Sequence, residues 1–113
     1  MTQRERVVRD TYRAWQDGDR DLIERCLSQD LSFYSPPDPG LDRGGYVERC
    51  WPHAGHTQRF DLKRLIETDD EVVVTYEATR PDGTQFRNTE IFTFDEQDRI
   101  KTIEVYFGWN LSA

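Results

Sequence analysis

Glu90 is the residue in this sequence best suited to proton-transfer chemistry. It stands between Thr89 and Ile91 in a strand-like segment, so its side chain faces inward if these two neighbours face outward. Burial among aromatic rings would raise the pKa of this carboxyl and keep part of it protonated near neutral pH, as general acid–base catalysis requires. The structural alternative is a glutamate hydrogen-bonded to Tyr12 or Asn88 as part of the core.

Glu77 and Glu104 are the other strand carboxylates, and either could share a cavity with Glu90, one group acting as base and the other as acid. Which of them faces inward depends on strand register, because a slip of one residue exchanges the two faces of a strand. A solvated or interface position is the alternative for each.

Aromatic side chains must supply much of the bulk of the fold, because only 35% of the residues are hydrophobic while the chain carries three Trp, five Tyr and six Phe. Large rings fill cores, and they also line pockets for flat organic molecules. We expect Tyr12 to be either a core ring or a hydrogen-bond donor to a developing oxyanion. The candidate wall and binding residues are Trp15, Phe33, Trp51, Phe60, Asn88, Phe92 and Phe107.

No motif predicts a metal, a cofactor or a nucleophile. His53 and His56 could shuttle protons or cap backbone groups of a loop, and their spacing is not a metal motif. Cys26 and Cys50 lack the Cys-x-x-Cys spacing, so we expect buried thiols rather than a disulfide or a zinc site. A glycine-rich phosphate loop, a serine elbow and a Cys/His pair are all absent from the sequence.

Three helices are predicted to support these side chains, at residues 2–16, 20–27 and 44–51. The first places Val8, Tyr12 and Trp15 on one stripe. Asp17-Gly18-Asp19 should end it, with Gly18 as a left-handed cap and Asp19 as the N-cap of the next helix.

Strands make up most of the remaining chain. A short strand is predicted at 31–35, followed by an irregular proline loop at 36–40, and a four-stranded antiparallel meander at 58–68, 71–80, 84–94 and 99–109. Helices followed by a meander predict one α+β domain over residues 1–113, with the helices packed on one face of a curved sheet.

The Asp82-Gly83 pair predicts a two-residue hairpin turn, which places Glu77 opposite Asn88 and Thr75 opposite Glu90. In this register Glu77 lies on the same face as Glu90. The other face would carry a more apolar set than solvent contact needs, consisting of Val72, Val74, Tyr76, Ala78 and Ile91. Because the helices cover only one face, we expect this second face to form a homodimer.

Charge and hydropathy restrict the partners. The formal net charge is −7, which disfavours nucleic acid and anionic membranes. No run of 18 apolar residues occurs, and the first ten residues are rich in charge. We therefore expect a cytoplasmic protein without a membrane span, whose partner is a small apolar or aromatic ligand.

The order of the predicted elements resembles the nuclear transport factor 2-like fold, and within it the branch of SnoaL-like polyketide cyclases and ketosteroid isomerases. The resemblance spans nearly the whole chain and is carried by residues 12–19 (Tyr-Arg-Ala-Trp-Gln-Asp-Gly-Asp), 30–33, 88–90, 94–95 and 99–108. It implies a cone of three helices on the concave face of a curved, mainly antiparallel sheet. It also implies an apolar pocket between the two layers, and often dimers built on the outer sheet face.

The isomerase branch uses a carboxylate base at the end of the first short strand, a tyrosine on the first helix and a protonated acid on a central strand. By resemblance these positions fall on Ser35, on Tyr12 within one residue, and on Glu90. A serine hydroxyl cannot take a proton from carbon at neutral pH without a base of its own. Ser35 is therefore expected to contact a ligand rather than to act as the base.

Three functions remain open at this stage. The first is a cofactor-independent isomerase, cyclase or dehydratase acting on a small apolar carbonyl compound by proton transfer, with Glu90 and Tyr12 as its catalytic residues. The second is a non-catalytic domain that binds a hydrophobic ligand in the same cavity. The third is a dimeric interaction module that needs no cavity.

Overall fold

Each of the three α-helices in the computed structural model, which describes residues 1–55 and 59–111, begins at a side-chain cap. The caps are Thr2 for α1 (Gln3–Asp17), Asp19 for α2 (Arg20–Cys26) and Asp42 for α3 (Arg43–Cys50), and a short 3-10 helix, η1 (Trp51–His53), follows α3. Helix α1 ends at Gly18, whose φ of 69° lies in the left-handed region that favours glycine. The caps predicted at Gly18 and Asp19 are confirmed.

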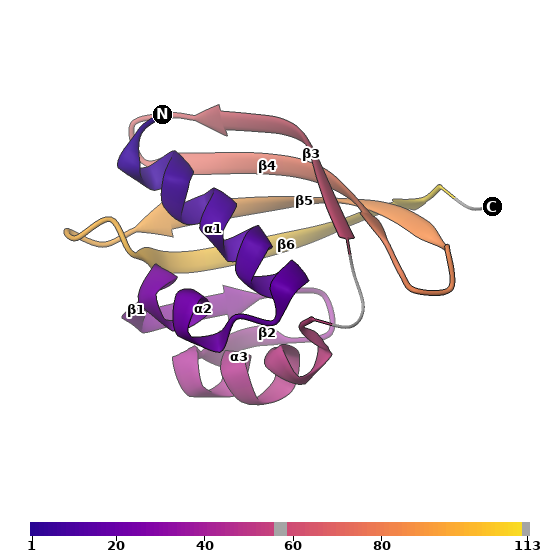
Figure 1. Ribbon diagram of the computed structural model, residues 1–113. Helices are drawn as coiled ribbons and strands as arrows, with labels where there is room; N and C mark the ends of the chain where they lie inside the picture. Colours follow the sequence, from indigo (N-terminus) through magenta and orange to yellow (C-terminus); the bar gives the residue numbers. More distant parts are fainter. Residues whose placement is uncertain (56–58, 112–113) are drawn as a thin grey trace.

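Six strands form one curved sheet in the order β2-β1-β6-β5-β4-β3. Their bounds are β1 (Leu27–Tyr34), β2 (Pro39–Asp42), β3 (Arg59–Glu67), β4 (Glu71–Thr79), β5 (Gln85–Phe94) and β6 (Ile100–Asn110). The β1–β6 pair is parallel and all other pairs are antiparallel. Helix α1 runs across one face of this sheet (Figure 1), which confirms the predicted α+β cone.

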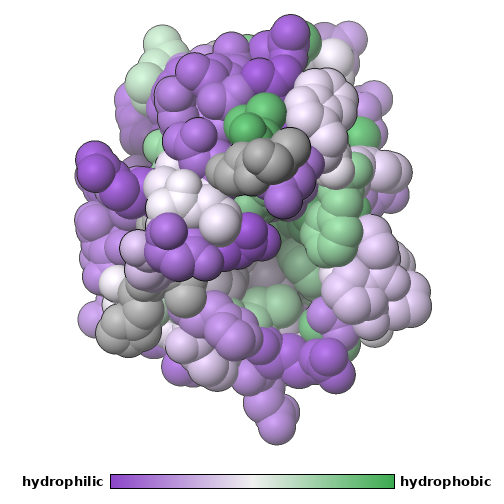
Figure 2. All heavy atoms as spheres, turned by 90° about the vertical axis from the view of Figure 1, so that its right-hand side faces the viewer, coloured by the Kyte–Doolittle hydropathy of each residue, from purple (hydrophilic) through white to green (hydrophobic). Residues whose placement is uncertain are grey.

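The β4–β5 hairpin and the end of β6 project from the same end of the molecule (Figure 1). Figure 2 views the molecule from this end and shows a hollow at its centre with apolar side chains around it. Among the helices within residues 1–55 and 59–111, none is long and apolar enough to cross a membrane.

The segment predicted as a proline loop is partly a strand. Residues Pro39–Asp42 form β2, which pairs with β1 through a bulge between Phe33 and Tyr34. A proline is tolerated here because β2 lies at the edge of the sheet, where Pro39 can stand as its first residue. Strand β1 also begins four residues earlier than predicted, since Leu27 already pairs with Ile100 of β6.

The register predicted for the β4–β5 hairpin is wrong by one residue. Val74 lies opposite Glu90 and Tyr76 opposite Asn88, because the loop has three residues, Pro81, Asp82 and Gly83. The Gly83 amide closes the turn on the Arg80 carbonyl at 2.9 Å, and Gly83 takes a φ of 89°. A two-residue loop would have put Pro81 in the ladder, where it has no N–H to donate.

This register moves four residues of the predicted outer patch into the core. Val72, Val74, Tyr76 and Ala78 are between 0 and 4% exposed and pack beneath the helices, so they offer no surface to a partner. Ile91 stays on the outer face. These four residues therefore do not support a homodimer, which stays a prediction.

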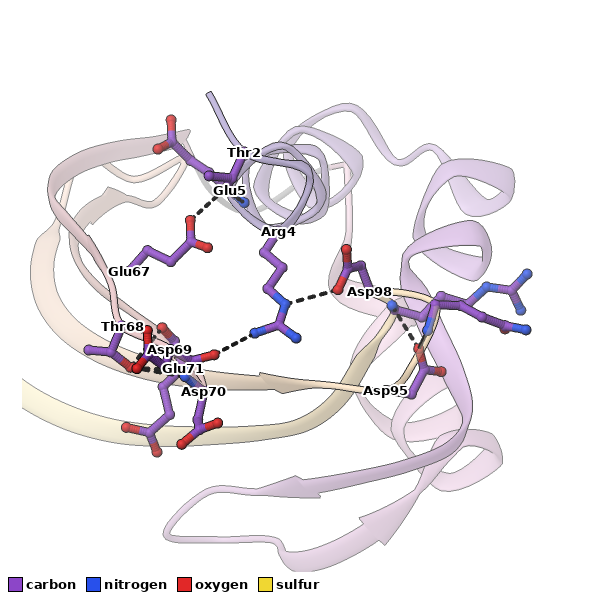
Figure 3. A network of polar contacts seen from close by, with 12 residues as sticks. Thr2, Arg4, Glu5, Glu67, Thr68, Asp69, Asp70, Glu71, Asp95 and Asp98 are labelled. Atoms are coloured by element: carbon purple, nitrogen blue, oxygen red, sulfur yellow. Dashed lines mark hydrogen bonds and ion pairs between the residues drawn. The ribbon is translucent and has the colours of Figure 1, made fainter.

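The first turn of α1 is tied to both hairpin turns at the opposite end of the cone (Figure 3). Arg4 donates from Nε to Asp98 Oδ1 and from Nη1 to the Asp69 carbonyl, each at 2.9 Å. The Thr2 hydroxyl donates to the Glu67 carboxylate at the end of β3. These bonds fix α1 lengthwise along the sheet and so determine where its later residues lie.

We expect Arg4→Met to lower the free energy of unfolding by about 1 kcal/mol, because the methylene stem is kept while both hydrogen bonds are lost. Urea unfolding measures the change. Arg6→Met is the matched control, since Arg6 is exposed and its contact is a 3.4 Å bond to Gln3. Equal losses of unfolding free energy in the two variants would show that the hydrogen bonds of Arg4 to the two turns do not stabilise the fold.

Candidate functional site

A cavity of about 680 Å³ lies between α1, α3 and the concave face of the sheet. Its lining includes eight of the residues predicted from the sequence: Tyr12, Trp15, Phe33, Ser35, Phe60, Asn88, Glu90 and Phe107. Figure 2 shows a hollow at this end of the molecule, and Phe107, one of the lining residues, is 60% exposed. A cavity of this size is in the range of small-molecule sites.

Two predicted wall residues lie elsewhere. Phe92 is 0% exposed and fills the core, with its ring 6.1 Å from that of Tyr12 in an edge-on arrangement. Trp51 packs edge-on behind Trp15 at 5.2 Å and faces a separate surface hollow between α2 and α3. Both residues support the wall from behind and do not form it.

Glu90 is the centre of the polar part of this cavity. Its Oε1 accepts a hydrogen bond from the Tyr12 hydroxyl at 3.1 Å, and its Oε2 accepts one from the Tyr76 hydroxyl at 3.0 Å. Tyr12 comes from α1 and Tyr76 from β4, so the carboxylate joins the helix layer to the sheet. The contact with Tyr12 is the one that the structural alternative predicted.

The surroundings of Glu90 shift its acidity. Desolvation raises the pKa of the carboxyl to about 7, against the opposing effect of the hydrogen bonds from Tyr76 and Tyr12. Although the group lies deep in the molecule, the residue keeps an intermediate exposure because the cavity reaches it. Near neutral pH, Glu90 is thus able both to accept and to donate a proton toward the cavity.

A short chain of hydrogen bonds orients Tyr76. Asn88 donates from Nδ2 to the Tyr76 hydroxyl at 3.2 Å, and Asn88 Oδ1 accepts from the Gly108 amide at 3.2 Å. At Gly108 the strands approach so closely that an added Cβ would lie 2.1 Å from the Arg87 carbonyl oxygen. Only glycine fits this position, and the bulge in the β5–β6 ladder at residues 86–88 accompanies it.

The other strand carboxylates lie outside the cavity. Glu77 is on the outer face, where its carboxylate pairs with the Arg87 guanidinium. Glu104 pairs with Ile91 on the same outer face and accepts from the Tyr106 hydroxyl at 3.2 Å. The hypothesis that either shares the cavity with Glu90 is therefore wrong, because the register turns both outward.

A family model, the SnoaL-like domain, matches residues 8–103. This chain belongs to the SnoaL-like domain family. The match covers most of α1 with Tyr12, the central strands with Glu90, and the first residues of β6, so it includes part of the cavity lining as well as the core. No curated protein sequence matches the chain.

Solved structures share the fold of this SnoaL-like chain at low identity. A nuclear transport factor 2-like protein of unknown function from Burkholderia pseudomallei has a TM-score of 0.78 at 21% identity, over 96% of this chain and 92% of that one. A candidate ketosteroid isomerase from Kribbella flavida has a TM-score of 0.81 at 12% identity, over 95% and 78%. TerC, co-crystallised with polyporic acid, has a TM-score of 0.79 at 18% identity, over 95% and 92%.

Residues that the sequence analysis did not select complete the SnoaL-like cavity. Asp38 lines it and its Oδ1 lies 3.0 Å from Arg49 Nη2, so the loop before β2 brings a paired carboxylate to the cavity. Arg80 also lines it and packs over the Phe86 ring at 4.3 Å. Asp38 was obscured by its proline-rich neighbours, which predict only a loop.

Tyr46 and Tyr76 were also missed. Tyr46 was not selected as a site residue, and the wrong hairpin register placed Tyr76 on the outer face. Pro81 is the signal that identifies Tyr76, because a proline before Asp-Gly favours the three-residue loop that turns Tyr76 inward.

The two histidines and the cysteines bring no metal site to the described residues. His53 is exposed and lines the cavity, whereas the prediction for His56 lies outside the described residues. Burial raises the pKa of Cys50 to about 11, which keeps this cavity-lining thiol protonated. In residues 1–55 and 59–111 no group of three His, Cys, Asp or Glu side chains is arranged to hold a metal ion.

The raised pKa of Glu90 predicts a pH-dependent stability. Between pH 4.5, the ordinary value, and pH 7 the unfolded chain loses this proton while the folded chain keeps it, so rising pH favours unfolding. Relative to Glu90→Gln, the wild type should lose about 2–3 kcal/mol of unfolding free energy across this range and no more above it. Urea unfolding at a series of pH values measures the difference.

Glu104→Gln is the matched control for this prediction, because Glu104 is a carboxylate of the neighbouring strand that faces outward. A loss of the same size in Glu104→Gln would show that the pH dependence does not belong to the cavity-facing carboxylate. A flat difference for Glu90→Gln would show that the folded-state pKa of Glu90 is ordinary.

Proposed function

We propose that this SnoaL-like domain binds a flat, mainly apolar carbonyl compound in its cavity and moves a proton on it, as an isomerase, cyclase or dehydratase does. One observation carries this proposal: a carboxylate with a pKa of about 7, held by Tyr12 and Tyr76, borders a cavity large enough for a small molecule. The aromatic walls suit a planar ligand, and Phe33 and Phe60 supply two of the rings.

Glu90 acts first as a base in this scheme. Its carboxylate takes a proton from the carbon next to the carbonyl, and the electrons of the C–H bond move onto the carbonyl oxygen to form an enolate. The protonated Glu90 then returns the proton, either to another carbon, which isomerises the ligand, or to a leaving oxygen, which completes a dehydration. No cofactor enters these steps.

The hydrogen bonds at Glu90 favour the base role in the unliganded domain. Both tyrosine hydroxyls point their protons at the carboxylate, so they stabilise its ionised form. Tyr12 is thus a positioning residue for Glu90 here, in contrast to the oxyanion donor that the family resemblance implied. Ser35 lines the cavity and is proposed to contact the ligand without acting as the base.

Deuterium exchange tests the proton transfer directly. In deuterium oxide, the domain should exchange the methyl protons of 2-acetylnaphthalene, with a rate that rises as Glu90 ionises through pH about 7 and then levels. Glu90→Gln should lower the enzymatic rate about 100-fold or more, because an amide cannot take the proton. Proton NMR follows the loss of the methyl signal.

Glu104→Gln serves as the control, since it removes a carboxylate that faces away from the cavity. Its exchange rate should equal that of the wild type. Exchange that is unchanged in Glu90→Gln would move the chemistry to another group, with Asp38 as the next carboxylate at the cavity. No exchange by the wild type would contradict catalysis on ketones of this shape.

A non-catalytic ligand-binding domain is the second candidate. It is favoured by the occupation of both Glu90 oxygens by tyrosine hydroxyls, because a carboxylate used only to hold α1 on the sheet would look the same. This function predicts saturable binding of the ketone without exchange. The cavity argues against the third hypothesis, a module that works through its outer sheet face and needs no cavity.

We also propose that two copies of the domain associate through the outer sheet face. Ile66, Val73 and Ile91 lie side by side across β3, β4 and β5 on this face, and Ile66 is 54% exposed. Tyr106 on the same face is 52% exposed. This band of apolar side chains replaces the patch predicted from the sequence as the support for a homodimer.

Sedimentation at micromolar concentration should give about 27 kDa, twice the monomer mass of 13.4 kDa. Ile91→Glu should halve this value, because it places a charge in the centre of the band. Gln97→Glu adds the same charge in the exposed β5–β6 turn and should leave the dimer intact. A wild-type protein that sediments as a monomer would exclude this interface.

A further inference from the structure

Tyr46 is the third tyrosine of the cavity, and it lies on α3, across from the sheet. Its residue is 3% exposed, and its ring packs against those of Phe33 at 4.8 Å and Trp15 at 6.1 Å. Packing of this kind fixes the ring and therefore fixes the position of the hydroxyl. Tyr46 lines the same cavity as Glu90.

The hydrogen bonds of the three tyrosines differ in one respect. A phenol has one proton to donate and lone pairs that accept. Tyr12 and Tyr76 both donate their hydroxyl hydrogen bond to Glu90. Tyr46 instead accepts, from the Trp15 indole nitrogen at 2.7 Å, and within residues 1–55 and 59–111 its own proton meets no acceptor.

A buried hydrogen-bond donor without an acceptor costs folding free energy, unless a ligand or water accepts from it. Burial raises the pKa of the Tyr46 phenol well above its ordinary value, so this group keeps its proton at any physiological pH. The indole N–H that points at the Tyr46 oxygen draws electron density from it, which makes the remaining O–H a stronger donor. The group is therefore a fixed donor inside a ligand-sized cavity.

We infer that the Tyr46 hydroxyl forms an oxygen-binding subsite, which donates a hydrogen bond to the carbonyl or enolate oxygen of a flat ketone held in the cavity. Trp15 positions this donor through its indole N–H. The inference rests on the proposed function, since it requires that a ligand enter the cavity. Tyr46 is then the oxyanion donor that the sequence and the family resemblance predicted at Tyr12.

This subsite divides the work between the two layers of the fold. Glu90, on the sheet, faces the carbon that loses the proton, and Tyr46, on α3, faces the oxygen that gains the charge. Hydrogen bonds to an anionic oxygen are stronger than those to a neutral carbonyl. Tyr46 would thus favour the enolate over the bound ketone, as an oxyanion donor must.

A pair of probes of the same shape tests the subsite. 2-Acetylnaphthalene carries the carbonyl oxygen, and 2-ethylnaphthalene lacks it. Tyr46→Phe should weaken binding of the ketone about 5- to 10-fold, the value of one hydrogen bond, and leave binding of the hydrocarbon unchanged. Quenching of tryptophan fluorescence measures both affinities.

The infrared band of the bound carbonyl gives a readout that packing alone would not move. With a ¹³C-labelled carbonyl, the band in the wild-type complex should lie below its frequency in hexane and return toward it in Tyr46→Phe. Tyr12→Phe is the matched control, since it removes a hydroxyl that donates to Glu90, and the lowered band should persist.

The outcomes separate a failure of the Tyr46 subsite from a failure of the proposed function. A wild-type band at the hexane frequency overturns the subsite without any variant, as does a lowered band that persists in Tyr46→Phe. Equal weakening of both probes in Tyr46→Phe shows that this residue only packs, and also overturns it. Failure of the wild type to bind either probe contradicts the proposed function itself, and the subsite with it.

Discussion

A carboxylate inside an apolar fold has to be matched by polar partners or remain protonated, and Glu90 does some of each. Tyr12 and Tyr76 satisfy its two oxygens, but desolvation still raises its pKa to about 7. Tyr12 reaches Glu90 only if α1 lies at one height along the sheet. The cap at Thr2 and the bonds of Arg4 to both hairpin turns hold it there (Figure 3).

The sequence predicted best where a single element decides the outcome. Val8, Tyr12 and Trp15 share a helical stripe, and helical spacing alone brings them to one face. Within β5 alternation is equally strict, so Glu90 and Asn88 had to share a face whatever the neighbouring strand did. These local rules account for Tyr12, Trp15, Asn88 and Glu90 among the cavity residues selected in advance.

Prediction failed where two elements have to be placed against one another. The Asp-Gly signal was read without Pro81, and the resulting slip of one residue reversed every side chain of β4 and hid Tyr76. Tyr46 could not be recognised as a donor from the sequence, because its hydroxyl is oriented by the indole N–H of Trp15 on another helix. Asp38 reaches the cavity from an irregular loop, and a loop has no periodic sequence pattern from which the direction of a side chain can be predicted. Sites assembled from several elements are lost in this way first.

Gly108 has a consequence beyond the shape of the strand. It has no side chain and lies at the sheet edge of the cavity, yet its amide begins a relay of three hydrogen bonds, through Asn88 and Tyr76, that ends on Glu90. Any larger residue would push β6 away from the Arg87 carbonyl and break the first link. A substitution of Gly108 would therefore change the acidity of Glu90, although Gly108 has no ionisable group. A mutational screen limited to ionisable residues would miss this effect.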